Sequence, residues 1–179
     1  RPKTFPFVPK CSHAEPVHLL LALDMETNRR HVDDVVAGGA VVHDEDIEVP
    51  EELHRPDVSF FPVALTKLAE ERGGRKIMRN TVAFGLAAGL MGFDLAHLNS
   101  VIRDNFAPKG QKVVDANLRV AEAGAEASEP FQADFPFRME AVSDAPPRMI
   151  LNGNEAFALG ALAGGCRFVA SYPMTPGSP

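Results

Sequence analysis

Residues 17–44 read VHLLLALDMETNRRHVDDVVAGGAVVHD, and this stretch decides the predicted fold. Its first part, Val17–Asp24, is an almost continuous apolar run that ends in an acid, which is typical of a strand buried on both faces of a parallel sheet. Glu26–Ala37 follows with helical spacing, and Gly38-Gly39 after it indicate the end of a helix. Ala40–Asp44 is then a second short strand. The stretch predicts a βαβ unit, whose crossover we expect to be right-handed.

The residues that follow continue this α/β pattern. Val58–Ala64 (VSFFPVA) predicts a third strand, and Pro62 indicates that it lies at a sheet edge or at a strand end, because proline has no N–H for the ladder. Asp94 has the side chain of a good helix N-cap. Four helices are expected after the third strand: Leu65–Glu71, Asn80–Gly92, Asp94–Phe106 and Gln111–Ala123.

The pattern breaks after residue 124 and restarts near residue 149. Gly124–Pro147 has scattered acids, four prolines and no sustained period, which predicts an extended linker. Asn152–Gly165 then predicts a helix rich in small residues, and Cys166–Pro173 a strand after it. We therefore predict a first domain at 1–124, a linker at 125–147 and the start of a second domain at 148–179. Because Arg1 is not a start residue, we interpret the sequence as an internal piece of a longer polypeptide.

The composition is that of a soluble globular protein, with 45% hydrophobic and 23% charged residues among 179. The net charge of −6 argues against a nucleic-acid binder, since phosphate neutralisation needs a basic face. The longest apolar run, Val82–Phe93, is shorter than the roughly 20 residues that a membrane-spanning helix needs, and it predicts a buried helix. We expect neither nucleic acid nor membrane as a partner.

The cysteines and histidines predict no metal site in this chain. Cys11 and Cys166 are isolated, so the ligands for a structural zinc or an iron–sulfur cluster are missing, and so is a disulfide framework. That cysteine usage fits a reducing cytosol, and we predict a cytoplasmic protein. The six histidines show neither HxH nor HExxH spacing. GxSxG and GxGxxG are also absent, so no nucleophile elbow or phosphate loop is visible.

Asp24 has two interpretations. It follows a buried strand, and the carboxyl ends of such strands are where open α/β sheets place groups that contact ligands. It also stands immediately before a predicted helix, where an aspartate serves as N-cap.

The last nine residues, Ser171–Pro179, read SYPMTPGSP and hold one threonine, Thr175, between Pro173 and Pro176. Proline fixes φ near −65°, so the turn is stiff around that hydroxyl. The segment is either an ordinary turn at the end of a strand or a rigid turn that directs the Thr175 hydroxyl toward a ligand.

Two terminal motifs resemble the alpha subunit of 2-oxoacid:ferredoxin oxidoreductases at the start of its pyrimidine-binding domain. The first motif is GNEA, Gly153–Ala156, before a Gly/Ala-rich helix. The second resembles the YPITPS turn of the family and consists of Tyr172, Pro173, Thr175 and Pro176. Met174 replaces the usual isoleucine, and Gly177–Pro179 depart from the common Ser-Ser-Glu continuation.

The front of the chain resembles the gamma domain of the same family. Residues 19–44 look like its second half, and RNTVAFGLAAGLMGF, residues 79–93, resembles its late helix. The resemblance implies a Rossmann-like parallel-sheet gamma domain, present as its C-terminal part, followed by the start of a thiamine-diphosphate pyrimidine-binding α/β domain. Gamma before alpha in one chain resembles the two-subunit enzymes that act on 2-oxoglutarate or on several 2-oxoacids.

The family resemblance also implies a reaction and a set of partners. It implies oxidative decarboxylation of a 2-oxoacid, with 2-oxoglutarate favoured, coenzyme A as acyl acceptor and ferredoxin as electron acceptor. A beta subunit would hold the thiamine diphosphate, its Mg²⁺ and a 4Fe-4S cluster in a hetero-oligomer. Thr175 would be catalytic, and Tyr172, Pro173, Thr175 and Pro176 would bind substrate. The alternative is a non-catalytic assembly module that packs beside catalytic subunits.

Overall fold

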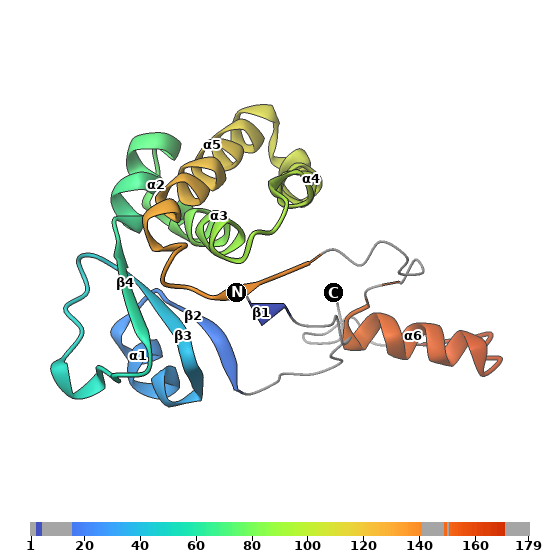
Figure 1. Cartoon of the computed structure of the whole chain (residues 1–179). Helices are drawn as coiled ribbons and strands as arrows, with labels where there is room; N and C mark the ends of the chain where they lie inside the picture. The colour runs from blue at the N-terminus through green and yellow to red at the C-terminus, as the bar shows by residue number, and fades with distance from the viewer. Residues whose placement is uncertain (1–2, 5–15, 141–148, 150, 171–179) are drawn as a thin grey trace. The chain divides into compact units, whose positions relative to one another are not determined.

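A computed structural model of the chain describes residues 3–4, 16–140, 149 and 151–170. The chain divides into two compact units, Arg1–Ala141 and Val142–Pro179. The first unit contains a three-stranded sheet and a layer of helices, and the described part of the second contains the helix α6, Gly153–Ala163 (Figure 1).

The three-stranded sheet of the first unit is parallel and has the strand order β2-β3-β4. Its strands are β2 (Val17–Ala22), β3 (Val35–Asp44) and β4 (Ser59–Val63). Val41 pairs with Leu20 on one side and with Phe60 on the other. The predicted α/β class with a parallel sheet is thus confirmed, and β4, which contains Pro62, lies at an edge of this sheet as expected.

Alternate residues of β3 lie in two different hydrophobic clusters, because successive side chains of a strand point to opposite faces. Val42 packs in the larger cluster with residues of the helices α2 (Leu65–Gly73), α3 (Arg79–Met91) and α5 (Gln111–Ala127), together with Phe135 and Phe137. Val41 packs in the smaller cluster with Val32, Val35 and Val58. This two-sided burial explains why the strands read as continuous apolar runs.

The predicted helix Glu26–Ala37 is too long. Helix α1 covers Met25–His31, a 3-10 turn covers Val32–Asp34, and β3 already begins at Val35. Gly38 therefore does not end a helix: it lies within β3 with φ 78°, where the strand pairing shifts from Val17↔Val35 to Leu19↔Ala40. Its N–H donates to the Asp57 carbonyl. Val35, only 2% exposed, favours a strand because it is β-branched and can be buried there.

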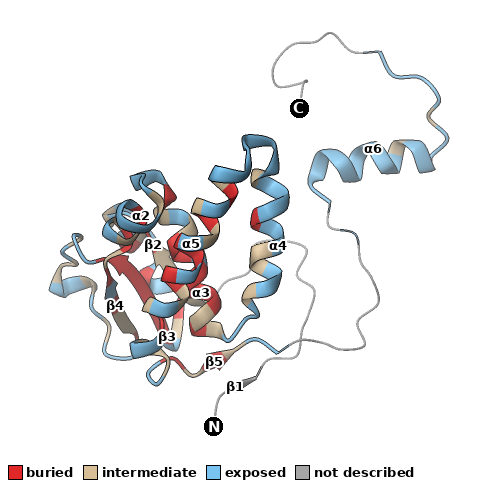
Figure 2. Ribbon diagram, turned by 90° about the horizontal axis from the view of Figure 1, so that it is seen from above, coloured by how far each residue is buried: buried red, intermediate tan, exposed pale blue. Residues whose placement is uncertain are grey.

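The helical layer agrees with the sequence prediction apart from its end points. Asp94 caps α4 as expected, since its carboxylate accepts a hydrogen bond from the Ala96 N–H at 2.8 Å. The helices are α2 (Leu65–Gly73), α3 (Arg79–Met91), α4 (Leu95–Phe106) and α5 (Gln111–Ala127). Short 3-10 turns lie at Glu51–Leu53, Lys76–Met78, Ala107–Lys109 and Glu129–Phe131. Figure 2 shows the buried residues concentrated where α3 and α5 lie over the sheet.

Residues 125–138 do not form the extended linker predicted for them. Helix α5 continues to Ala127, and β5 (Phe137–Arg138) pairs in parallel with β1 (Lys3–Thr4). Phe135 is 0% exposed in the main core, and the Arg138 guanidinium donates to the Leu90 carbonyl at 2.7 Å. Tertiary burial of this aromatic segment overrides its irregular local pattern. The domain boundaries at 124/125 and 147/148 remain predictions.

The second unit contains α6, Gly153–Ala163, close to the helix predicted there. Asn152 and Glu155 form a capping box: the Asn152 side chain accepts from the Glu155 N–H at 2.9 Å, and the Glu155 carboxylate accepts from the Asn152 N–H at 2.8 Å. No strand follows α6 in its described residues, since 166–170 have no regular structure, so that part of the strand prediction Cys166–Pro173 is wrong. The start of a pyrimidine-binding domain remains a prediction.

Candidate functional site

The four residues that the sequence motif nominated, Tyr172, Pro173, Thr175 and Pro176, lie outside the described residues. Their arrangement therefore remains a prediction. Asp24, the other residue singled out from the sequence, is described, and it leads to a cleft in the first unit.

This cleft, of about 340 Å³, lies where strands β2 and β3 end. Parallel α/β sheets bind ligands at this edge, beyond the carboxyl ends of their strands. The residues that line it come from the ends of both strands and the segments just after them, from the starts of α1, α2 and α3, and from the turn before α3: Leu23, Asp24, Met25, Asp44, Asp46, Ile47, Thr66, Lys76 and Arg79. We call it the carboxyl-edge cleft.

Asp24 is the N-cap of α1. Its carboxylate accepts hydrogen bonds from the Thr27 N–H at 2.7 Å and from the Thr27 hydroxyl at 2.8 Å. The backbone hydrogen bond from Thr27 lowers the pKa of Asp24, and the Thr27 hydroxyl and the charge of Arg79 lower it further. The capping interpretation of Asp24 is therefore confirmed, and the same carboxylate lines the cleft.

Asp44 lies deeper in the cleft and is only 3% exposed. Its Oδ2 accepts hydrogen bonds from the N–H of Thr66 at 3.0 Å and from the Thr66 hydroxyl at 2.5 Å, which tie the end of β3 to the start of α2. Its Oδ1 is buried and has no hydrogen-bond partner in the described structure. A buried carboxylate oxygen without a donor is costly, so this atom is a natural acceptor for a ligand donor.

Asp44 was not among the residues that the sequence pattern nominated. The signal was present, because Asp44 ends the second predicted strand just as Asp24 ends the first. What the sequence lacked was the position of Thr66, 22 residues further along the chain, which occupies one oxygen of Asp44 and leaves the other without a partner.

Lys76 and Arg79 supply positive charge to the same cleft. In the described part of the chain, neither side chain takes part in an ion pair. The cleft therefore combines a buried acceptor, Asp44 Oδ1, with two cations and with two further acidic residues, Asp24 and Asp46. This arrangement can bind a polar molecule whose hydrogen-bond donor reaches Asp44 Oδ1.

Two histidines outside the cleft make local contacts within the fold. His43 is buried, and its Nδ1 lies 3.0 Å from the Asp44 carbonyl oxygen, while His31 pairs with Asp34 at 2.9 Å. Cys166 is a free thiol. Within residues 3–4, 16–140, 149 and 151–170, no group of three His, Cys, Asp or Glu side chains could hold a metal ion. None of the described helices has the length and apolar character needed to cross a membrane.

Comparison with known proteins matches most of the chain to one family. The model for pyruvate ferredoxin/flavodoxin oxidoreductase matches residues 8–127. The ketoisovalerate oxidoreductase subunit VorA of Methanothermobacter thermautotrophicus is 33% identical over 110 residues, which are 60% of this chain and 22% of that protein.

Two solved structures are similar to the chain. A 2-oxoglutarate:ferredoxin oxidoreductase from Magnetococcus marinus, with 2-oxoglutarate, coenzyme A and succinyl-CoA bound, superposes with a TM-score of 0.76 at 28% identity, over 89% of this chain and 28% of that one. The gamma subunit of a keto/oxoacid ferredoxin oxidoreductase from Geobacter sulfurreducens has a TM-score of 0.52 at 22% identity, over 62% of this chain and 63% of that one, and so shows the fold alone. The chain spans about a quarter of the length of VorA and of the Magnetococcus chain.

Proposed function

The chain belongs to the pyruvate ferredoxin/flavodoxin oxidoreductase family, and we propose that it forms part of a subunit of a CoA-dependent 2-oxoacid:ferredoxin oxidoreductase. In this proposal its first unit is the C-terminal part of a gamma domain and its last residues open a pyrimidine-binding domain. The family membership agrees with the resemblance that the sequence motifs indicated.

The observation that carries this proposal is the likeness to the Magnetococcus 2-oxoglutarate enzyme, which extends over 89% of the chain and so includes residues on both sides of the predicted linker. That enzyme has 2-oxoglutarate, coenzyme A and succinyl-CoA bound. VorA is named for a different 2-oxoacid, ketoisovalerate. We favour 2-oxoglutarate as the substrate because the order gamma before alpha and the Magnetococcus enzyme point the same way.

Thr175 has the central role for this chain in the proposal. Thiamine diphosphate, when bound, supplies the nucleophilic carbon that decarboxylation of a 2-oxoacid requires. The Thr175 hydroxyl donates a hydrogen bond to the substrate carboxylate or to a developing oxyanion, and Pro173 and Pro176 hold the turn so that little reorganisation is needed. Tyr172 completes the substrate-binding turn.

The remaining cofactors belong to other chains in this proposal. A 4Fe-4S cluster takes four thiolate ligands, and the sequence has two cysteines. We therefore assign the cluster, the thiamine diphosphate and its Mg²⁺ to a beta subunit, and the complex is a hetero-oligomer. Coenzyme A accepts the acyl group, and ferredoxin accepts the electrons.

The test uses the complete polypeptide that contains this chain, co-expressed with its beta subunit. We expect reduction of an artificial electron acceptor that requires both coenzyme A and a 2-oxoacid, with kcat/KM highest for 2-oxoglutarate among 2-oxoglutarate, pyruvate and ketoisovalerate. A complex that assembles with full cofactor content but oxidises none of the three would overturn the catalytic proposal and favour an assembly module. Preference for another 2-oxoacid would overturn only the choice of substrate.

A further inference from the structure

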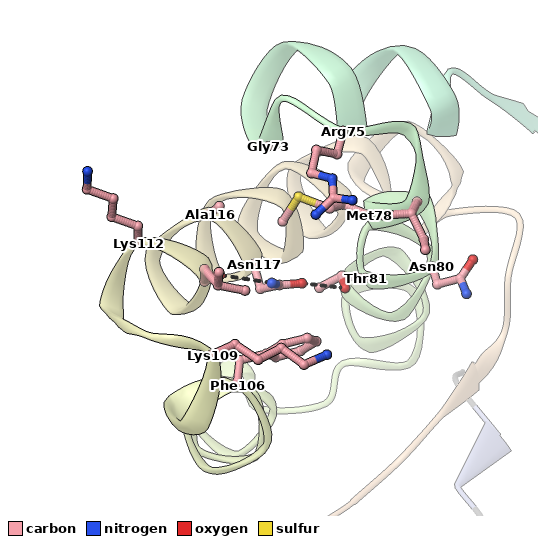
Figure 3. A pocket seen from close by; sticks show the side chains of 12 residues that line it. Gly73, Arg75, Met78, Asn80, Thr81, Phe106, Lys109, Lys112, Ala116 and Asn117 are labelled. Atoms are coloured by element: carbon pink, nitrogen blue, oxygen red, sulfur yellow. Dashed lines mark hydrogen bonds between the residues drawn. The ribbon is translucent and has the colours of Figure 1, made fainter.

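The helical layer of the first unit contains a larger cavity that the proposed function does not use. It has a volume of about 660 Å³ and is lined by residues from the end of α2, the turn before α3, α3 itself, the end of α4 and the start of α5 (Figure 3). Sites for small organic molecules occupy roughly 300–1,000 Å³, so its size fits a ligand of that kind. We call it the helical pocket.

Three cations line the helical pocket: Arg75, Lys109 and Lys112. None of its lining residues is acidic, although the whole chain carries a net charge of −6. Among the residues that the structure describes, none of the three cations takes part in an ion pair. Lys109 Nζ lies over the Phe106 ring, 5.2 Å from its centroid. Positive charge is therefore gathered here, and no described acidic residue lines the pocket or pairs with these cations.

The floor of the pocket is polar but already paired. Asn117, 4% exposed, donates to the Val113 carbonyl at 2.9 Å and accepts a hydrogen bond from the Thr81 hydroxyl at 2.9 Å. In Figure 3 the side chains of Arg75 and Lys109 lie on opposite sides of this Asn117–Thr81 bridge, while Lys112 extends away from it. An anionic group over the bridge would thus meet Arg75 and Lys109 first.

The walls of the pocket are largely apolar. Met78 and Phe106 face it together with Val113, and Ile77 stands at its rim with 71% of its surface exposed. An apolar ligand part that covered Ile77 would remove this surface from water and gain the usual hydrophobic stabilisation.

We propose that the helical pocket binds a small organic anion, with a phosphate or carboxylate group between Arg75 and Lys109 and an aromatic or branched apolar body against Ile77 and Phe106. The positive charge of the pocket favours an anion. Its apolar walls favour an anion with an apolar body over a free inorganic ion. This site goes beyond the proposed function, because the residues assigned to that function, Tyr172–Pro176, are not among those that line the pocket.

The experiment measures binding of 2-naphthyl phosphate to the chain by naphthyl fluorescence anisotropy. The chain has no tryptophan and one tyrosine, so its own fluorescence interferes little. We expect 2-naphthyl phosphate to bind at least about tenfold more tightly than 2-naphthol, which lacks the charge, and than inorganic phosphate, which lacks the apolar body. Inorganic phosphate is measured by competition, and 2-naphthoate distinguishes a phosphate site from a carboxylate site. Equal affinity for 2-naphthol and 2-naphthyl phosphate would overturn the proposal.

Substitutions inside the helical pocket, each with a matched control outside it, test whether the ligand binds there. Arg75→Gln and Lys109→Gln should each weaken binding by about fivefold, the effect expected for one charge pair in water. Arg103→Gln and Lys67→Gln change the net charge equally at exposed positions outside the pocket, and they should leave the affinity unchanged. Ile77→Ser should weaken binding of 2-naphthyl phosphate, whereas Phe84→Ser, at a side chain that is 61% exposed and does not line the pocket, should not.

All six positions are exposed, so far-UV circular dichroism should show the same fold for every variant. If pocket and control variants weaken binding equally, the anion binds non-specifically and the proposal fails. The measurement needs neither cofactor nor turnover, so its outcome is independent of whether the complete enzyme oxidises 2-oxoacids.

Discussion

Gly85 of α3 lies directly against the backbone of Ala121 of α5, with no space between them for a side-chain carbon. A Cβ added at Gly85 would overlap the Ala121 carbonyl oxygen, and one added at Gly124 would overlap the Val82 carbonyl oxygen. Glycines on both helices thus let α3 and α5 approach until their backbones touch. This crossing lies at the centre of the helical layer, where Val82, Leu86 and Val120 are fully buried.

Gly85→Ala should therefore destabilise the first unit. The atoms that a new methyl group would meet belong to backbone, which cannot move aside without separating the helices, and overpacking of this kind costs typically about 1–3 kcal/mol. Urea unfolding followed by circular dichroism measures the effect. The control is Gly160→Ala in α6, where nothing lies within 4 Å of the added Cβ. An unchanged unfolding midpoint for Gly85→Ala would contradict the close crossing.

Phe135→Ala should lower the free energy of unfolding by about 3–5 kcal/mol, the usual cost of removing a buried aromatic side chain. The reason is that Phe135 is 0% exposed and packs in the main core, edge-to-face with Phe137. Phe157→Ala removes an identical side chain that is 80% exposed, and it should have little effect on the same transition. If the two variants were equally stable, residues 128–138 would be a linker after all.

Asp24 should contribute to the stability of the first unit in a pH-dependent way. Hydrogen bonds from Thr27 hold the pKa of Asp24 in the folded state below its ordinary value of 3.8. A lowered folded pKa means that the stabilisation is complete above pH 3.8 and is lost as the pH falls through the folded pKa.

The variant Asp24→Asn keeps a capping side chain but cannot ionise. Its stability should therefore fall less than that of the parent chain on acidification below pH 3.8, as measured by urea unfolding at a series of pH values. Asp24→Ser, which also caps without ionising, should behave in the same way. Parallel acid profiles for all three proteins would show that Asp24 does not couple folding to protons.

Asp44→Ala should lower the free energy of unfolding by about 1–3 kcal/mol, because the N–H and hydroxyl of Thr66 lose their common acceptor. Asp44→Asn has a side chain of nearly the same shape, keeps one acceptor oxygen and removes a buried charge. It should therefore retain most of the stability. Urea midpoints of both variants test this. An alanine variant as stable as the asparagine variant would mean that the contact between β3 and α2 does not depend on Asp44.

Thr175→Val in the complete enzyme should keep the shape of the side chain and lose its hydroxyl. If the hydroxyl serves the transition state, kcat should fall about 100- to 1,000-fold, the cost of one oriented donor. If it binds only the ground-state carboxylate, KM should rise instead. Steady-state turnover at matched cofactor content measures both constants. Unchanged kcat and KM would reduce the YPMTP turn to an ordinary end of a strand.

The sequence by itself determined the elements whose residues carry a local period or a local cap. The apolar runs of β2 and β4 and the spacing of α2 to α5 predicted these elements correctly to within a few residues. Asp94 was recognisable as an N-cap because a cap involves only the next few residues along the chain. The family was recognisable from the sequence, and the family model matches residues 8–127.

Only the tertiary structure decided the features that depend on partners distant in the chain. Val35 belongs to β3 because it is buried in a cluster with Val58. Phe135 belongs to the core because it packs in one cluster with residues of α3 and α5. Asp44 became a candidate ligand contact only when Thr66 was seen to occupy one of its oxygens. Burial and pairing depend on where the folded chain brings residues together, and that information is absent from any short window of sequence.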